Sequence, residues 1–496
     1  MPHMRRTRAV VAATAAALVL AACGTQVSDT KRRALEAQQL VSGSGNAAAP
    51  SGVLPPSTPV TAPTDNGVLP VPTEGGGATT AATTGPVTSG GRKSTGGGKT
   101  AASSGGLPAG IGAPAPPGGN GGATDVGVTA NQILLGNVSD LSGPQPGLFQ
   151  SAINGTNAYI AYINSLGGIY GRQLKIDVAD SQTSCEGDRN GISQLIGKVF
   201  AFSGSASLND QCGATVLGAH KTVPDAHLAV TPQANALPNN YSVTPIGSKV
   251  SNGPFKWGTD RFHDAVKHVG FLYANLPAVN NVASLSIHSA QTVGWNFVVH
   301  QSVSPTSTDF TAQIIQMRQR GVKLFYTLFD AQELAEFLRN ANQQNFHPVI
   351  FAPLAYDQTF FTQLGNTSLA NGIYGFNGAT LFFSKSDAHI PSVALFQKWY
   401  GAVSHNGPAD SFGADAWAET ELLVNAIAEA GPNLTRQKVL AALSKVHSYD
   451  ANGFFGKSDP ADKKAGNCFV PWQIRNGEYY RVGVGPNGLV CQGVPR

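Results

Sequence analysis

The sequence is poor in the groups on which several protein classes depend. Charged residues make up only 12% of the chain and the formal net charge is +4, so the composition does not favour a nucleic-acid partner. Neither a G-x-S-x-G nor an H-E-x-x-H motif occurs, and no two cysteines have the C-x2-C spacing of a zinc site. The 11 histidines are scattered along the chain. We therefore predict no catalytic activity, no metal and no cofactor, with an exported enzyme as the less favoured alternative.

Aromatic residues are missing from the first part of the chain. All 23 Phe, 5 Trp and 12 Tyr lie at or after Phe149. Residues 24–125 consist mainly of Gly, Ser, Thr, Ala and Pro, which cannot offset a backbone ordering entropy of ~1–2 kcal/mol per residue. We predict that 24–125 form a disordered tether with a span on the order of 50–60 Å. The remaining length of about 370 residues suggests two domains.

The N-terminus has the pattern of an export signal. Arg5, Arg6 and Arg8 precede the apolar stretch 9–20, which is too short to span a bilayer. The following Leu20-Ala21-Ala22-Cys23 resembles the bacterial lipobox, which implies cleavage before Cys23 and diacylglycerol on its sulfur. The alternative is a secretory signal that happens to contain a cysteine. We expect lipidation at Cys23 and a protein anchored to the outer face of a bacterial cytoplasmic membrane or to the cell surface.

Four cysteines remain after Cys23, and an even number in an exported chain suggests two disulfides. Four cysteines allow three pairings. We favour Cys185 with Cys212 and Cys468 with Cys491, because each pair closes a short loop and each bond would then stabilise the fold by roughly 3 kcal/mol.

Apolar periodicity predicts alternating strands and helices. The run 133–138 is typical of a buried strand, and residues 150–166 have helical character before Gly167-Gly168. A helix beginning near Asp309 precedes an apolar strand over 322–329. Short connections between such elements imply parallel sheets, hence an α/β fold.

Later segments continue this pattern. Asp330 can cap a helix that carries Leu334 and Phe337 on one face, and 349–351 reads as the next strand. Two further helices are expected, one ending at Gly431-Pro432 and one capped by Thr435. An Asn476-Gly477 turn between strand-like flanks predicts a hairpin.

Several motifs in sequence order resemble the leucine/isoleucine/valine-binding family of the type 1 periplasmic-binding-protein fold. The resemblance covers about 127–457. It rests on the following segments: Ile133-Leu134-Leu135-Gly136, Leu141-Ser142-Gly143-Pro144, Gly167-Gly168-Ile169-Tyr170-Gly171-Arg172, Asp180 with Cys185 and Cys212, Thr231-Pro232-Gln233-Ala234-Asn235, and Phe412-Gly413-Ala414-Asp415-Ala416.

The resemblance implies two Rossmann-like lobes that close on a ligand, as in a Venus flytrap. After the signal 1–23 and the tether, we assign 126–248 plus 378–457 to the first lobe. We assign 249–377 plus 458–496, with the C-terminal hairpin, to the second. The family implies capture of a small polar solute, such as an amino acid or an amide, and its delivery to an ABC transporter permease. A tethered sensor or surface-interaction protein with the same fold is the alternative.

The resemblance also implies the ligand contacts. Loops at the carboxyl ends of strands are expected to supply them, since ligands of open α/β sheets bind there. We predict Ser142, Phe149, Ser205, Ser207, Gln233 and Asn235 from the first lobe, and Tyr273, Asn275, Asp330 and Tyr356 from the second.

One position departs from the family pattern. Where amino-acid receptors carry a carboxylate for the ligand ammonium, this chain has Leu354. An unpaired buried ammonium is costly, so either Asp330 or Asp357 replaces that partner or the ligand is not an α-amino acid. We favour the second option.

Overall fold

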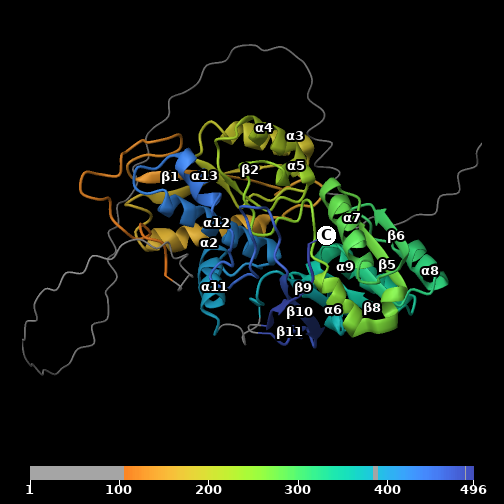
Figure 1. The fold of residues 1–496 in the computed structure, drawn as a ribbon. Coiled ribbons are helices and arrows are strands. Elements are labelled where there is room, and N and C mark those ends of the chain that lie inside the picture. The colour runs from red at the N-terminus through yellow and green to blue at the C-terminus, as the bar shows by residue number, and fades with distance from the viewer. Residues whose placement is uncertain (1–105, 384–388, 486–487, 496) are drawn as a thin grey trace, which may run out of the picture. The chain divides into compact units, whose positions relative to one another are not determined.

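The computed structural model describes residues 106–383, 389–485 and 488–495, and its strands form two sheets (Figure 1). The first sheet has four parallel strands in the order β2-β1-β3-β4. We call this sheet and the helices packed on it lobe 1. Its strands are β1 (Gln132–Ser139), β2 (Gln173–Asp180), β3 (Ala201–Ser203) and β4 (Asp225–Ala226).

The second sheet has eight strands and, with its helices, forms lobe 2. Five strands are parallel in the order β9-β8-β7-β5-β6, and β10 pairs antiparallel with β9, β11 and β12. These strands are β5 (Val269–Ala274), β6 (Phe297–Val303), β7 (Leu324–Thr327), β8 (Val349–Phe351), β9 (Tyr374–Asn377), β10 (Cys468–Arg475), β11 (Glu478–Arg481) and β12 (Val490–Cys491). The α/β architecture with parallel sheets in two lobes confirms the predicted fold class.

Helices of lobe 1 come from two separate parts of the chain. Tyr159 of α2 packs edge-on against Trp417 of α12, with ring centroids 4.9 Å apart, so the returning segment completes this lobe. The helices are α2 (Gln150–Ser165), α3 (Cys185–Leu195), α4 (Asp210–Ala219), α5 (Pro232–Asn235), α11 (Pro391–Val403), α12 (Ser411–Glu429) and α13 (Arg436–Leu443).

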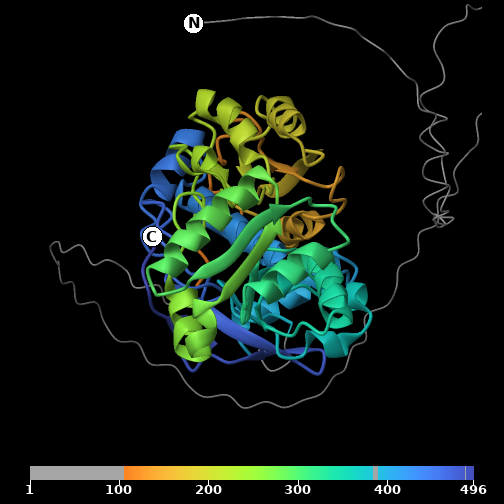
Figure 2. The ribbon, with the colours of Figure 1, turned by 90° about the vertical axis from the view of Figure 1, so that its right-hand side faces the viewer.

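Lobe 2 has helices on both faces of its sheet (Figure 2). Along β7 the side chains alternate: Leu324 and Tyr326 pack with the cluster that contains Phe255 of α6, while Phe325 packs with Phe337 of α9. The helices are α6 (Gly253–Phe262), η1 (His263–Lys267), α7 (Pro277–Gln291), α8 (Thr311–Gln319), α9 (Ala331–Gln343), η2 (Pro353–Ala355), α10 (Phe360–Leu364) and η3 (Thr367–Ala370).

The chain passes between the lobes three times. These connections lie between α5 and α6, between β9 and α11, and between α13 and β10. The second and third connections pair with each other, since Gly456 N donates to Gly378 O at 3.0 Å and Thr380 N donates to Phe454 O at 2.8 Å. The residue boundaries assigned to the lobes stay predictions.

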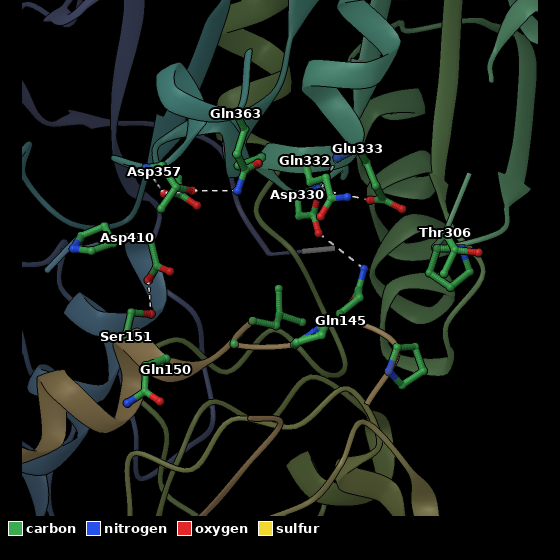
Figure 3. Close-up of a pocket in the computed structure, with 18 of the residues that line it drawn as sticks. Gln145, Gln150, Ser151, Thr306, Asp330, Gln332, Glu333, Asp357, Gln363 and Asp410 are labelled. Carbon is green, nitrogen blue, oxygen red and sulfur yellow. Dashed lines mark hydrogen bonds between the residues drawn. The ribbon is translucent and has the colours of Figure 1, made fainter. Parts of the chain in front are cut away.

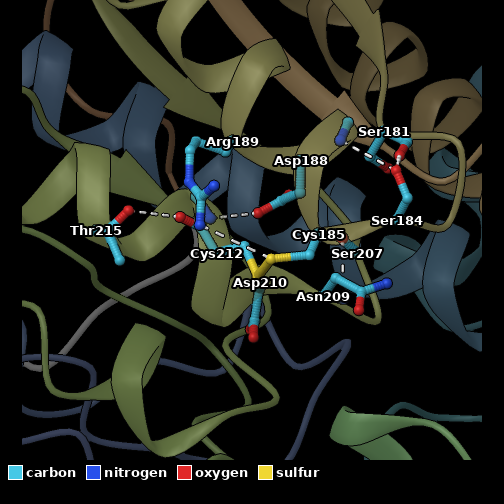
Figure 4. The surroundings of a disulfide bond; sticks show 12 residues. Ser181, Ser184, Cys185, Asp188, Arg189, Ser207, Asn209, Asp210, Cys212 and Thr215 are labelled. Atoms are coloured by element: carbon cyan, nitrogen blue, oxygen red, sulfur yellow. Dashed lines mark hydrogen bonds between the residues drawn. A yellow bond between two sulfur atoms is a disulfide. The ribbon is translucent and has the colours of Figure 1, made fainter.

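Both predicted disulfides are present. Cys185 at the start of α3 is bonded to Cys212 of α4, with Cα atoms 5.3 Å apart (Figure 4). Beside this bond, Asp188 of α3 accepts a hydrogen bond from Gly213 N of α4 at 2.6 Å. Cys468 is bonded to Cys491 across the antiparallel pair β10–β12.

Residues 106–125 correct the predicted tether, because they pack on lobe 1. The buried Arg172 guanidinium donates to the carbonyl oxygens of Asn120, Gly122, Thr129 and Pro432 at 2.5–3.1 Å. Asn120 Nδ2 donates to Ala130 O and Tyr170 O. Polar contacts with main-chain carbonyls, together with packing of Ile111 against the core, thus order this segment.

The predicted signal, Cys23 and the rest of the tether lie outside the described residues. Within the residues that are described, no helix has the length and apolar character needed to cross a membrane.

Candidate functional site

A cavity of about 380 Å³ has walls from both lobes (Figure 3). Lobe 1 supplies the loop before α2, the first turns of α2 and the segment before α12, while lobe 2 supplies the loops after β6, β7 and β8. We call this cavity the cleft. Its polar lining includes Gln145, Gln150, Ser151, Asn154, Thr306, Asp330, Gln332, Glu333, Asp357, Thr359, Gln363 and Asp410.

The cleft is acidic. Four carboxyl groups line it, from Asp330, Glu333, Asp357 and Asp410, whereas none of the described residues along its wall is Lys, Arg or His. Asp330 follows β7 and Asp357 follows β8, so the parallel strands of lobe 2 bring both to the carboxyl edge of the sheet. Asp410 comes from lobe 1.

Helix capping holds two of these carboxylates in place. Asp330 caps α9: its Oδ1 accepts from Glu333 N at 2.8 Å, and Glu333 Oε2 accepts from Asp330 N at 3.2 Å. Asp410 caps α12 by accepting from Gly413 N at 2.9 Å. The positive end of each helix dipole favours negative charge at these positions.

Contacts join the acidic groups to their surroundings. From lobe 1, Gln145 Nε2 points to Asp330 Oδ2 of lobe 2 at 3.5 Å (Figure 3). Ser151 Oγ donates to Asp410 Oδ1 at 2.5 Å. The main chains of Asp357 and Asp410 form an isolated antiparallel bridge, so carboxyl groups of the two lobes lie close together.

Burial raises the pKa of every carboxyl in this group. The pKa of Asp410 rises to about 7, first through burial and then through the charge of Asp357. The pKa of Glu333 rises to about 8 through burial and the charge of Asp330. Burial also raises the pKa of Asp330 and of Asp357. A cation in the cleft would favour the ionised forms, whereas an anion would oppose them.

An apolar recess of about 70 Å³ adjoins the cleft and shares Gln145, Asp330 and Asp357 with it. Its apolar lining is Leu148, Phe149, Leu208, Ala274, Leu276, Val279, Leu328, Ala331, Leu354, Tyr356 and Phe412. Phe149 and Phe412 meet edge-on at 4.7 Å between ring centroids. The site can therefore hold a charged group against a short apolar surface.

Three of the predicted ligand residues line this site. Asp330 lies in both the cleft and the recess, and Phe149 and Tyr356 line the recess. Tyr356 is buried, and its hydroxyl accepts from Phe383 N at 3.0 Å.

The other predicted residues lie elsewhere, each with its own environment. Ser142 Oγ donates to Asp180, and Asn235 Nδ2 donates to Ser248. The remaining residues are placed as follows: Ser205 and Ser207 border a small internal cavity of lobe 1 that also contains His227, Gln233 and Asn275 are exposed, and Tyr273 packs on Phe271.

Sequence reasoning missed Gln145, Ser151, Glu333 and Asp410 as lining residues. The sequence does indicate a helix N-cap at Asp410, since Asp is a favoured residue at that position and Ser411 begins the helix. Nothing local shows that this cap faces loops more than 50 positions earlier in the chain, so only the tertiary arrangement identifies it.

Comparison with known families decides the classification. The sequence model of a family described as periplasmic binding protein matches residues 132–478. The chain belongs to this family.

Solved structures share its type 1 fold. A fatty acid ABC transporter substrate-binding protein from Thermomonospora curvata has 18% identity and a TM-score of 0.62, over 72% of this chain and 93% of that protein. A branched-chain amino acid transporter substrate-binding protein from Streptococcus pneumoniae, in complex with isoleucine, has 17% identity and a TM-score of 0.58, over 71% and 99%. A benzoate complex of a solute-binding protein from R. palustris has 16% identity and a TM-score of 0.59, over 71% and 96%.

These periplasmic binding proteins are solute receptors of ABC transporters and not enzymes. A search of curated proteins finds no match.

The raised pKa of Asp410 predicts a pH-dependent stability. In the unfolded chain an aspartate has a pKa of about 3.9. The contribution of Asp410 to the free energy of unfolding is therefore fully present below about pH 4 and is lost as pH rises through about 7. Asp410→Asn keeps the cap but cannot ionise. We expect the free energy of unfolding of this variant, relative to the parent, to rise by about 1.4 kcal/mol or more between pH 5 and pH 8.5 in urea titrations.

Asp260→Asn is the control, because Asp260 is exposed and pairs with Lys256 one turn earlier on the same helix. The free energy of unfolding of Asp260→Asn should differ from that of the parent by the same amount at every pH in this range. If Asp410→Asn and the parent have parallel pH profiles, Asp410 does not resist ionisation in the folded state.

Proposed function

We propose that this protein is an extracytoplasmic solute-binding lipoprotein that captures a small polar ligand in the cleft and presents it to an ABC transporter permease. The cleft, with walls from both lobes and a Gln145–Asp330 contact between them, is the observation that carries this proposal. A ligand that touches both walls binds the closed arrangement better than the open one and therefore shifts the equilibrium toward closure. Family membership supports the same function.

The charge of the cleft points to a ligand with a positively charged group. The solutes named for two of the similar proteins, a fatty acid and benzoate, are carboxylates. Here four carboxyl groups line the cleft with no basic residue among its described lining, so a ligand whose only charge is negative would be repelled. Leu354 lines the recess, and Asp330 and Asp357 line the cleft beside it. We infer that these two carboxylates pair with the ammonium group of the ligand.

This charge distribution revises our preference at the Leu354 position. The sequence favoured a ligand other than an α-amino acid, because no carboxylate stood at that place. Asp330, Asp357 and Asp410 surround one cavity. An α-amino acid and a cationic ligand that is not an α-amino acid are therefore both compatible with the site.

Membrane anchoring belongs to the proposal and has its own test. Lipid on Cys23 would hold the chain at the outer face of the cytoplasmic membrane. We expect labelled palmitate to be incorporated into the wild-type protein in a bacterial host and to be absent from Cys23→Ser, as seen by autoradiography. Equal labelling of both proteins would exclude this attachment site.

Ligand chemistry can be tested with a thermal-shift panel of ammonium-bearing, neutral and carboxylate-only solutes. We expect solutes with an ammonium group to raise the melting temperature, and Asp357→Asn to weaken their binding by about tenfold or more in calorimetric titrations, because it removes one of the carboxylates that pair with the ammonium. Binding should strengthen from pH 6 to pH 8 as the carboxyl groups ionise.

Asn275→Ala is the matched control, since Asn275 is exposed and is not among the described residues that line the cleft. Its affinity should equal that of the parent. The cleft assignment fails if Asp357→Asn binds as tightly as the parent or if only carboxylate solutes bind.

A further inference from the structure

The four carboxyl groups of the cleft form two pairs (Figure 3). Asp357 of lobe 2 and Asp410 of lobe 1 are joined by the isolated bridge between their main chains, and we call them the first acidic pair. Asp330 and Glu333 are joined by the capping box of α9, and we call them the second acidic pair. Figure 3 shows the two pairs at separate positions along the cleft.

Within each pair the two carboxyl groups are close enough to share one cation. Burial, and after it the charge of Asp357, raises the pKa of Asp410 to about 7. Burial and the charge of Asp330 raise the pKa of Glu333 to about 8. An ammonium group has three donors, so it can contact both members of a pair, and its charge favours their ionised forms.

The two pairs are within reach of one small molecule. Burial and, more weakly, the charge of Asp330 raise the pKa of Asp357, which belongs to the other pair. Such an effect between charges extends over about 10 Å at moderate ionic strength. The two carboxylates assigned above to ammonium binding, Asp330 and Asp357, thus belong to different pairs around one cavity of about 380 Å³.

The recess gives both pairs an apolar neighbour. All four carboxyl residues line the recess as well as the cleft. The same recess is lined by Leu148, Phe149, Leu354 and Phe412. Among the described residues that line the two spaces, none is Lys, Arg or His. The site therefore presents negative charge at two positions, each beside an apolar surface.

This arrangement restricts the charges of the ligand. A ligand with a single ammonium group would compensate one acidic pair and leave the other without a partner, which is costly in a partly buried site. A carboxylate on the ligand would add negative charge to a cleft that already has an excess. Two ammonium groups joined by an apolar chain fit both pairs and the recess. Both amines of such a molecule are protonated at neutral pH, as the usual pKa of about 10.4 for a lysine amine indicates.

On the basis of the proposed function, we propose that the ligand of the cleft is an aliphatic diamine without a carboxyl group. One ammonium group contacts Asp357 and Asp410, and the other contacts Asp330 and Glu333. The methylene groups that join them pack on the apolar side chains of the recess. Because the first acidic pair has one member from each lobe, the ammonium group that it binds contacts both lobes.

Matched probes test this proposal on the full chain by calorimetric titration. Pentylamine is cadaverine without one ammonium group, and lysine is cadaverine with an added carboxylate; butylamine and ornithine have the same relation to putrescine. We expect the tighter-binding diamine to bind at least about tenfold more tightly than its monoamine, because the monoamine lacks one charge-assisted contact. We expect an advantage of similar size over its amino acid, because the acidic groups repel the added carboxylate.

Two double variants test the role of each pair. Asp357→Asn with Asp410→Asn neutralises the first acidic pair. Asp330→Asn with Glu333→Gln neutralises the second and keeps the capping box, since Asn and Gln serve there as Asp and Glu do. We expect each double variant to bind the diamine at least about tenfold more weakly and only about as tightly as the monoamine, which still has one pair to contact.

The matched control is Asp260→Asn with Asp264→Asn. It changes the net charge by the same amount, and both side chains are exposed and absent from the described lining of the cleft and the recess. This variant should bind every probe like the parent.

The diamine assignment is overturned if the monoamines or the amino acids bind as tightly as the diamines, or if a folded pair variant keeps the advantage of the diamine. In these cases capture of a cation by the cleft still stands. If no amine binds, both the diamine assignment and the proposed capture of a cationic solute are wrong.

Discussion

Acidic side chains that face one another across a cavity constrain the rest of this structure. Asp330 and Asp410 are held at helix N-termini, where backbone N–H groups compensate part of their charge. The remaining charge has no basic partner among the described lining residues, and burial raises the pKa of each group. The protein thus retains an unfavourable electrostatic arrangement at the place where its lobes meet, which is typical of a site that a ligand completes.

The cleft and the adjoining recess differ in the chemistry of their linings. The cleft offers carboxyl groups and amides, while the recess offers leucine and aromatic side chains. Leu354 forms part of the wall of the recess. At this position the protein has an apolar wall, and its acidic groups are at Asp330, Asp357 and Asp410.

Local signals predicted much of the fold. The strand at 133–138, the Asp330 and Thr435 caps and the Asn476-Gly477 hairpin are confirmed, since each depends on contacts within a few residues. The order of residues 106–125 could not be predicted, because it depends on the Arg172 guanidinium, distant in sequence. The same reason explains why Gln145 and Asp410 were missed. Polar residues such as Ser142 and Asn235 were predicted to contact the ligand, but in the structure their side chains hydrogen-bond to neighbouring residues.

The central claim is that one solute contacts both lobes at once and draws them together. Spin labels on Gln194→Cys of α3 and Gln316→Cys of α8, both exposed positions, report the distance between lobes 1 and 2 by double electron–electron resonance. With a solute that the thermal-shift panel identifies, the account predicts a shorter and narrower distance distribution than without it. A distribution unchanged by saturating solute would contradict the account.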